Sequence, residues 1–378
     1  MKVIVHSGYD TVDGAAWDRL VGPEGSPFLE HIFLSGLEDL GCAVPDTGWA
    51  ARPVTVHDDD DNLIGAAPAW ATAHSMGEFV YDHGWADAAH RAGLEYYPKL
   101  VVGIPFTPAT GQRLLVDPEV NDPETVRLGL LQGLRAAAED CHGIHVLFDT
   151  KDEADWLAEQ GLFERLQFQF HWNNEGYETF EDWLARFVSK KRNKIRRERK
   201  DLRGVTLEAT VNPSMDRLMA MHRFYQNTCR QFGPWGRVYL SREMFAFLGE
   251  HWGDRLHLVT ARDGDRIVAG AFNVIKGDRL YGRYWGSDDH VPFLHFEVCY
   301  YQAIEECIRR GLKVFEPGHG GGHKYRRGFE PTITRSSHWL ADSRLHEGLE
   351  HYSGQEARSV HRRVAELREQ LPLKPRET

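Results

Sequence analysis

The chain has 378 residues, 42% of them hydrophobic and 11% aromatic, so it is long enough for two domains with sizeable cores and is not intrinsically disordered. Its apolar runs are too short to span a bilayer, its first ten residues do not read as a signal peptide, and its five cysteines form no CxxC pair. We therefore expect a cytoplasmic protein without a disulfide framework or a zinc site, and its formal net charge of −11 excludes a general polyanion-binding protein.

The first half of the chain predicts an alternation of helices and strands. Ser26 followed by Pro27 is a typical helix start, and Gly41 ends that first helix. A turn of four consecutive aspartates, residues 58–61, joins two strand-like runs; we interpret it as a solvated hairpin turn, with a metal site as the alternative. The strands and helix expected around it are, in chain order, strands 49–56, 63–71 and 99–104, helix 124–140 and strand 144–149.

A basic helix is predicted over residues 180–203, with Thr179 and Asp182 as an approximate capping box. Between residues 188 and 203 it carries nine basic residues against two acidic ones. One reading is a solvated charged helix. The other is a phosphate-binding surface, because like charges four residues apart cost a few tenths of a kcal/mol each, about 0.2–0.5, which a bound anion would offset. The candidate phosphate-binding residues are Lys190, Lys194, Arg196 and Arg197.

The second half repeats the order of the first. Ser241 caps a helix that ends at Gly253, and Asp263-Gly264 is a strong hairpin signal. The remaining elements expected there are strands 256–261, 267–275 and 279–285, helix 295–310 and strand 313–316. Because helix, hairpin, strand, loop, helix and strand occur twice, we interpret the chain as a structural duplication.

The segment 316–329 is the densest functional signal. Its glycines let the backbone approach a ligand closely, and its cations stand beside them. An anionic-ligand or catalytic loop is the leading reading, and a structural glycine turn is the alternative. His319 and His323 have HxxxH spacing, but the glycines between them argue against a helical metal site. The candidates are Gly318, Gly320, Gly321, Gly322, His323, Lys324, Arg326 and Arg327, with Lys324 expected to face solvent.

His295 and Glu297 fall in the first turn of the helix that follows the third strand of the second half. Either side chain could accept the proton of an attacking amine. For Glu297 the alternative is simple matching of the helix dipole.

Three stretches resemble the bacterial FemAB-like proteins: SKKRNKIRRER from Ser189, YYPKL with PFTP from Tyr96, and LHFEVCYYQ with FEPG and HKYRRGF from Leu294. The resemblance covers nearly the whole chain. It implies an α/β fold of two tandem GNAT-like domains, each a mixed, mostly antiparallel sheet flanked by helices. The expected parts are an N-terminal domain (1–165), a connecting segment with the basic helix (166–212), a catalytic C-terminal domain (213–345), and a C-terminal helix and tail (346–378).

The resemblance also implies a function. The wider Fem group transfers amino acids from aminoacyl-tRNA to the peptide of a peptidoglycan precursor, and its F-K-x-G-F pattern is similar to the segment from His323 to Phe329, here with two more residues between lysine and glycine. Lys324 is thus implied as a phosphate or carbonyl contact. No permanently bound cofactor or metal is implied, and no oligomeric state is indicated.

Three functions are compatible with the sequence. The leading one is an acyltransferase that moves an aminoacyl or acyl group from an aminoacyl-tRNA-like ester to an amine of a small molecule or peptide. The alternatives are an acyl-CoA-dependent N-acyltransferase and a non-catalytic RNA- or nucleotide-binding protein. In the acyltransferase readings we expect the first half to contact the acceptor through Tyr97 and Lys99.

Overall fold

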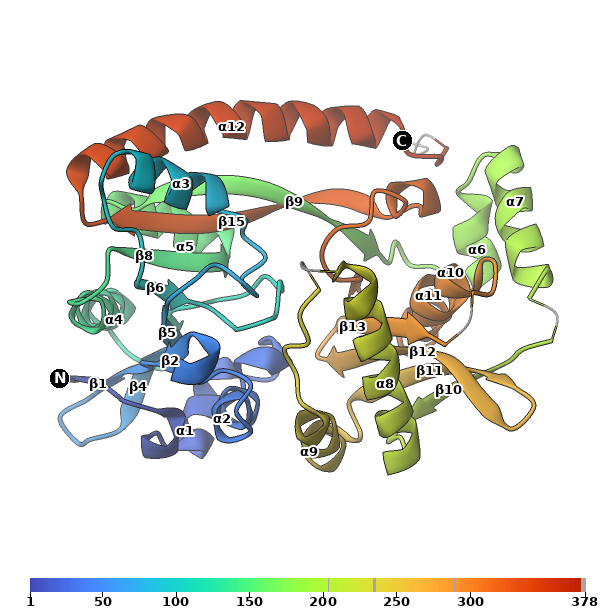
Figure 1. The fold of residues 1–378 in the computed structure, drawn as a ribbon, viewed down its shortest axis with the longest axis horizontal. Helices are drawn as coiled ribbons and strands as arrows, with labels where there is room; N and C mark the ends of the chain where they lie inside the picture. Colours follow the sequence, from blue (N-terminus) through green and yellow to red (C-terminus); the bar gives the residue numbers. More distant parts are fainter. Residues whose placement is uncertain (203, 234–235, 289, 375–378) are drawn as a thin grey trace. The chain divides into compact units, whose positions relative to one another are not determined.

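The computed structural model describes residues 1–202, 204–233, 236–288 and 290–374. The chain forms two compact units (Figure 1): unit 1 comprises Met1–Phe168 and Ile333–Arg363, and unit 2 comprises Gln169–Thr332 and the chain from Val364 on. Three predicted segments include residues outside the described ones. Arg203 belongs to the predicted basic helix, residue 289 to the loop before the helix 295–310, and residues 375–378 to the tail.

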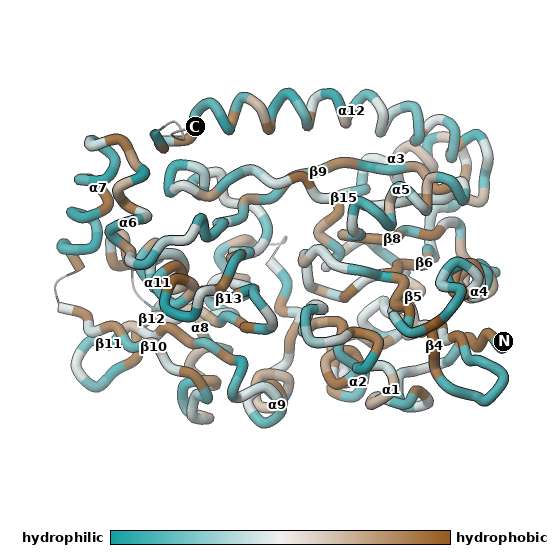
Figure 2. The backbone as a smooth tube through the Cα atoms, turned by 180° about the vertical axis from the view of Figure 1, so that it is seen from behind, coloured by the Kyte–Doolittle hydropathy of each residue, from teal (hydrophilic) through white to brown (hydrophobic). Residues whose placement is uncertain are grey.

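Unit 1 contains two sheets. The first has the order β1-β3-β4-β7, from Lys2–Val5, Val54–His57, Leu63–Ala67 and Leu115–Val116. In the second, β2, β5 and β6 are antiparallel neighbours and β8 runs parallel to β6; these strands are Trp49–Ala51, Ala69–Thr72, Lys99–Val102 and Gly143–Asp149. The main core packs the strands of both sheets against the helix α4 (Pro123–Ala137), and Figure 2 shows β4 and β5 as hydrophobic.

Two predictions for unit 1 are corrected. The runs 49–56 and 63–71 are not continuous strands, because each breaks next to a proline, Pro53 or Pro68, that has no amide to donate. The two halves of each run therefore join different sheets. The helix expected from Pro27 to Gly41 is instead a 3-10 turn, Pro27–Leu29, followed by α2 at His31–Asp39.

Unit 1 contains three further short helices. The first, α1 (Gly14–Val21), was not predicted, although Asp13 caps it by accepting hydrogen bonds from the amides of Ala15 and Ala16. The other two are α3 (His83–Arg91) and α5 (Lys151–Glu159).

Unit 2 contains one sheet in the order β10-β11-β12-β13-β14-β9. Its first five strands are Thr206–Val211, Leu256–Asp263, Arg266–Lys276, Arg279–Ser287 and Val314–Glu316. The hairpin between β11 and β12 and the helix α9 (Arg242–Trp252) capped by Ser241 confirm the predictions for this region. Helix α8 (Met215–Gln231) packs on β12 and β13 (Figure 1).

Two helical segments of unit 2 differ from prediction. The basic helix is two helices, α6 (Phe180–Ala185) and α7 (Ser189–Lys200), because the buried Phe187 and the extended Val188 interrupt it. The helix 295–310 begins as α10 (Leu294–Phe296), passes through a π-helical turn (Glu297–Tyr301) and continues as α11 (Gln302–Arg310).

The two units share one connection pattern. In unit 1, β6 and β8 are parallel and α4 connects them; in unit 2, β13 and β14 are parallel and the α10–α11 segment connects them. In each unit, an antiparallel strand from a different part of the sequence then pairs with the second parallel strand. The end of β9 (Phe163–Asn173) pairs with β14, and β15 (Glu330–Leu340) pairs with β8, before α12 (Ser343–Glu369) follows.

Candidate active site

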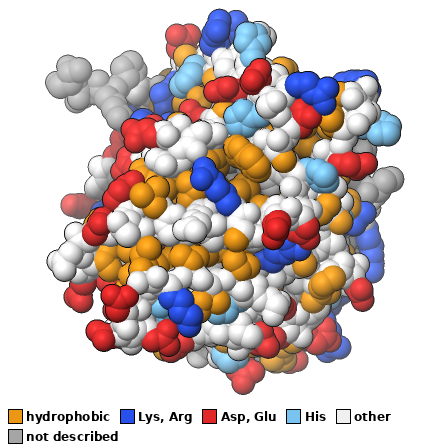
Figure 3. Space-filling model, turned by 90° about the vertical axis from the view of Figure 1, so that its left-hand side faces the viewer, with side chains coloured by type: hydrophobic (Ala, Val, Ile, Leu, Met, Phe, Trp, Pro, Cys, Tyr) orange, Lys and Arg blue, Asp and Glu red, His pale blue; other side chains and the backbone are white. Residues whose placement is uncertain are grey.

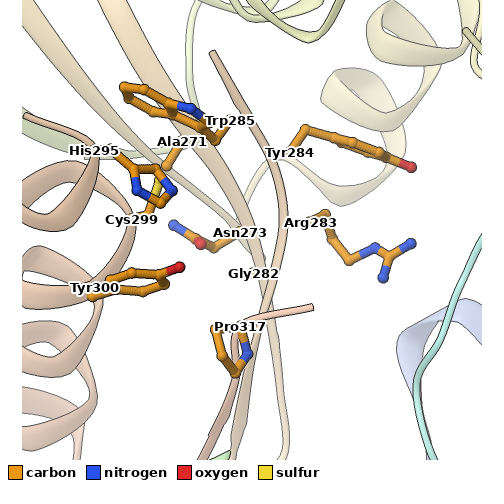
Figure 4. Close-up of a pocket in the computed structure, with 10 residues that line it drawn as sticks. All are labelled: Ala271, Asn273, Gly282, Arg283, Tyr284, Trp285, His295, Cys299, Tyr300 and Pro317. Atoms are coloured by element: carbon orange, nitrogen blue, oxygen red, sulfur yellow. The ribbon is translucent and has the colours of Figure 1, made fainter. Parts of the chain in front are cut away.

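A cavity of about 70 Å³ lies beside β13 in unit 2 (Figure 4). This volume can hold several water molecules or one small acyl group. In Figure 4, His295, Cys299 and Tyr300 lie on one side of β13, and Arg283 and Tyr284 point to the other side. The lining residues are Ala271, Asn273, Gly282, Arg283, Tyr284, Trp285, His295, Cys299, Tyr300 and Pro317.

The cavity exists because β13 outruns its parallel partner. The pairing of β13 with β14 covers only three residues and ends at Tyr281 opposite Glu316, whereas β13 continues to Ser287. Beyond Tyr281, that edge of β13 has no strand partner in the described chain. A bulge at Arg283 also interrupts the ladder with β12, because Phe272 faces Tyr284 while Asn273 faces Gly282. Backbone groups of β13 thus line the cavity.

The wall opposite β13 comes from the π-helical turn. Such turns are rare and occur often at functional sites. The hydroxyl of Tyr300 lies 2.9 Å from Nε2 of His323, and the ring of His295 lies 4.9 Å from that of Trp285 and 5.4 Å from that of His323. Burial lowers the pKa of His295 to about 3 and that of His323 to about 4, and it raises the pKa of Tyr300 well above its ordinary value. At neutral pH all three groups are therefore uncharged.

Lys324 does not face solvent, contrary to prediction, because its side chain is only 2% exposed. Its Nζ donates to the carbonyl oxygens of Pro317 at 3.1 Å and Gly318 at 2.7 Å. Burial lowers its pKa to about 7. The amine therefore stabilises the conformation of the loop that contains it.

The glycine-rich loop can fold around Lys324 because its backbone is left-handed at three places. Gly318, Gly320 and Gly321 have φ of 78°, 72° and 82°. These values favour glycine, because a Cβ atom is strained there. At Gly321 a Cβ atom would also lie 3.1 Å from Cε of Lys324, whereas a Cβ atom at Gly322 would meet nothing within 4 Å. The loop carbonyls thus point at the lysine.

Glu297 does not line the cavity. Its carboxylate accepts hydrogen bonds from Arg199 at 2.9 Å (Nε) and 2.8 Å (Nη2) and from Nε2 of Gln302 at 2.8 Å. The side chain is buried, so these partners fix it in place. The general-base role of Glu297 stays a prediction, and its carboxylate is occupied by an ion pair with α7.

The candidate cations of the basic helix have different surroundings. Arg196 forms an ion pair with Glu181, and Lys194 lies 3.9 Å from Glu198. Lys190 and Arg197 are exposed. Figure 2 shows α7 as mostly hydrophilic. Figure 3 shows another face, the left-hand side of Figure 1, on which acidic and basic side chains are dispersed. From the loop after β14, Arg326 is exposed and Arg327 is buried against Glu198 at 3.2 Å.

Tyr97 and Lys99 belong to unit 1, whereas the other candidates belong to unit 2. Lys99 is fully buried, and its Nζ donates to Glu78 at 2.8 Å and forms an ion pair with Asp82. The hydroxyl of the half-buried Tyr97 lies 2.7 Å from Oγ of Ser75. The predicted contacts of both residues with the acceptor stay predictions. The ammonium of Lys99 is already paired with the carboxylates of Glu78 and Asp82.

Asn273 and Trp285 line the cavity but were not predicted as site residues. One signal was available, because β13 contains two glycines, and glycine inside a strand often marks a close backbone approach. At Gly286 a Cβ atom would lie only 2.0 Å from the carbonyl oxygen of Phe224.

The described residues contain no group of three or more His, Cys, Asp or Glu side chains that could hold a metal ion. In the aspartate turn, Oδ1 of Asp58 accepts hydrogen bonds from the amides of Asp60 and Asn62. None of the helices that the structure describes is long and apolar enough to cross a membrane.

The family model FemAB-like, described as peptidoglycan biosynthesis/recognition, matches residues 8–375. Among solved structures, FemX is 13% identical with a TM-score of 0.55, and the likeness covers 93% of this chain and 100% of that chain. L-PGS from Bacillus licheniformis is 11% identical with a TM-score of 0.50, over 93% and 98% of the two chains. No curated protein matches the sequence significantly. The likenesses confirm the predicted α/β fold class of two tandem GNAT-like domains.

Proposed function

The chain belongs to the FemAB-like family, and we propose that it is an acyltransferase that moves an aminoacyl or acyl group from an activated ester to an amine. The reaction takes place in the cavity of unit 2. The observation that carries this proposal is the cavity, in which the bulged strand β13 faces His295 and Tyr300.

Acyl transfer needs a proton acceptor for the attacking amine. The imidazole of His295 lines the cavity and is uncharged at neutral pH, so it has a lone pair available. The amine nitrogen bonds to the ester carbonyl carbon and gives its proton to His295. The carbonyl oxygen becomes an oxyanion, which backbone amides lining the cavity would stabilise.

The departing oxygen needs a proton when its bond to the acyl carbon breaks. Tyr300 can supply it, because its raised pKa keeps the hydroxyl protonated. When His323 donates from Nε2 to the Tyr300 oxygen, the hydroxyl hydrogen is free to point into the cavity. The proton taken up by His295 returns to Tyr300 through solvent, which closes the cycle.

The leading donor is an aminoacyl ester of tRNA, and the supporting observation is the basic helix α7 in the same unit as the cavity. An acyl-CoA thioester is the alternative. The acceptor is an amine on a small molecule or on a peptide such as a peptidoglycan precursor, in keeping with the family description. Cytoplasmic location remains part of this proposal.

The test offers the purified protein both donor classes in parallel. Charged tRNA or acyl-CoA is incubated with a pool of amine-bearing peptidoglycan precursor peptides, and transfer is followed by the mass gained by the peptide. We expect transfer from one donor class, lost in the variant His295→Ala. Absence of transfer from either class with the folded protein contradicts the proposal and favours the non-catalytic RNA- or nucleotide-binding alternative.

A further inference from the structure

Two cations, Lys194 and Arg327, lie beside one buried carboxylate in unit 2. Glu198 of α7 is buried, and its carboxylate lies 3.2 Å from Nη2 of Arg327 and 3.9 Å from Nζ of Lys194. The charges of Arg326 and Arg327 also act on Lys191 of α7, together with those of Lys194 and Glu198. A single acid therefore balances the cluster incompletely.

Arg327 contributes a donor without an acceptor. The side chain is only 5% exposed, and its Nε is buried and has no hydrogen-bond partner. A buried donor left unpaired costs about 1–3 kcal/mol. The guanidinium is fixed by Glu198 and by the ring of Phe296, whose centroid lies 3.1 Å away. Such a rigid, unsatisfied donor indicates an acceptor that the protein itself does not supply.

Lys191 points to the same conclusion. It is half-buried, and within the part of the chain that the structure describes no ion pair or hydrogen bond engages its amine. Burial and the neighbouring Arg327 lower its pKa to about 8. Desolvation and like charge both disfavour its ammonium, and a bound anion would offset them by stabilising the charged form.

We infer that Lys191, Arg326 and Arg327 form a binding subsite for a phosphate group, distinct from the exposed side of α7. Guanidinium groups and an ammonium are the donors that proteins use for phosphate. The exposed Arg326 can close over the ligand, since its guanidinium contacts the neighbouring Tyr325, through the hydroxyl at 3.0 Å and over the ring.

The subsite is one aromatic layer away from the cavity. Phe296, which carries Arg327 on its ring, stacks on Tyr300 with ring centroids 6.4 Å apart and lies 5.7 Å from the ring of His323. If the proposed function holds, the phosphate belongs to the donor, near its activated ester. A phosphodiester at the 3′ end of an RNA and a phosphate of coenzyme A share this chemistry.

The test uses inorganic pyrophosphate as the probe and does not depend on turnover. Lysine amines are briefly acetylated with acetic anhydride at pH 8, and the modification of Lys191 is compared with that of Lys190 by peptide mass spectrometry. At pyrophosphate about ten times above its Kd, we expect Lys191 to be protected about tenfold, because only the unbound fraction reacts. Lys190 should not be protected relative to sodium chloride at equal ionic strength.

Two variants sharpen the result. Arg326→Gln should abolish protection of Lys191, whereas the matched control Arg197→Gln, an exposed arginine of α7, should leave it intact. Equal protection of Lys190 and Lys191 overturns the subsite, as does no protection of Lys191 by pyrophosphate, coenzyme A or an RNA ending in CCA, and so does loss of protection in Arg197→Gln. Both variants replace exposed side chains, and a circular-dichroism spectrum verifies that they fold.

Further arms replace pyrophosphate by coenzyme A or by a short RNA ending in CCA. Protection by either supports the subsite and identifies the source of the phosphate. Protection without acyl transfer from any donor contradicts the proposed function and leaves the subsite standing. Transfer without protection by any of the three probes overturns the subsite alone.

Discussion

In each unit two parallel strands pair over a short length and then diverge. In unit 1 the chain itself fills the space between the diverging strands, whereas in unit 2 this space contains the cavity. In unit 1, β6 and β8 pair up to Val102 opposite Val146, and the loop before α4 then occupies the gap. The amide of Gly111 donates to the carbonyl of Phe148 at 3.1 Å, and Nε of the fully buried Arg113 donates to that of Leu147 at 2.8 Å. In unit 2 the corresponding edge of β13 borders the cavity.

The difference shows that the same position in one fold can be filled by stabilising contacts or can form a cavity for a ligand. Arg113 also donates to the carbonyls of Ala109 and Gly111. The side chain and loop of unit 1 thus fill the space and supply hydrogen-bond donors to the carbonyls there. In unit 2, Lys324 donates to carbonyls of the loop after β14, and the cavity beside β13 is the proposed ligand site. Catalysis is therefore expected in unit 2 alone.

The largest expected effect concerns the open gap. His295→Ala and Tyr300→Phe should each lower the rate of acyl transfer by about 10²–10⁴, because they remove the proposed proton acceptor and donor. The matched controls are His290→Ala and Tyr352→Phe, both exposed and outside the cavity lining. Losses below about tenfold, with the protein folded, would move the chemistry away from this cavity.

The next effect concerns the filled gap. Arg113→Met should lower the free energy of unfolding by about 3 kcal/mol or more, because several buried carbonyls lose their donor at once. Activity per folded molecule should not change. Urea denaturation measures the loss, and Arg91→Met, an exposed arginine of α3, is the control. A loss of stability as small as that of the control would mean that the contacts of Arg113 do not stabilise unit 1.

A smaller effect is expected at Glu297. Glu297→Gln should lower the transfer rate less than about tenfold and the unfolding free energy by about 1–3 kcal/mol, because the ion pair with Arg199 weakens. A double-mutant cycle with Arg199→Met should show coupling between the two residues. A rate loss of about 10² or more at unchanged stability would instead make Glu297 the general base.

The pH dependence of stability should differ in sign between the units, beginning with Lys324 in unit 2. Burial lowers its pKa from 10.5 to about 7, so between these values the unfolded chain binds more protons than the folded one. The unfolding free energy should rise with pH in this window, by at most about 1.4 kcal/mol per pH unit. Lys324→Met should remove that rise. Parallel pH profiles of variant and wild type would show that the amine does not titrate there.

Glu78 should give the opposite slope in unit 1. Burial raises its pKa from 4.5 to about 8, so the folded protein keeps a proton that the unfolded chain releases in this window. Stability from this group is complete below about pH 4.5 and is lost as the pH rises through 8. Glu78→Gln mimics the protonated acid, so the variant should gain stability relative to wild type from pH 5 to pH 8. A constant difference between them would contradict the assignment.

Local signals predicted the outline of the fold, and tertiary contacts decided the site. The cap at Ser241 and the turn at Asp263 specify structure within a few residues, and both were confirmed. The burial of Lys324 could not be predicted, because sequence does not show that distant carbonyls converge on one amine. The π-helical turn could not be predicted either, because it departs from the side-chain periodicity expected of an α-helix.

The strands β9 and β15 have a consequence for how the protein is made. The sheet of unit 1 includes residues 335–340 of β15, and His338 of that strand packs against Trp85 in the interior of unit 1. A ribosome synthesises the chain from its N-terminus, so the first 168 residues emerge long before this strand does. Unit 1 therefore stays unfinished, with the edge of β8 unpaired, until nearly the whole chain has been translated. Separating the two units at a single cut would leave β8 without its partner strand.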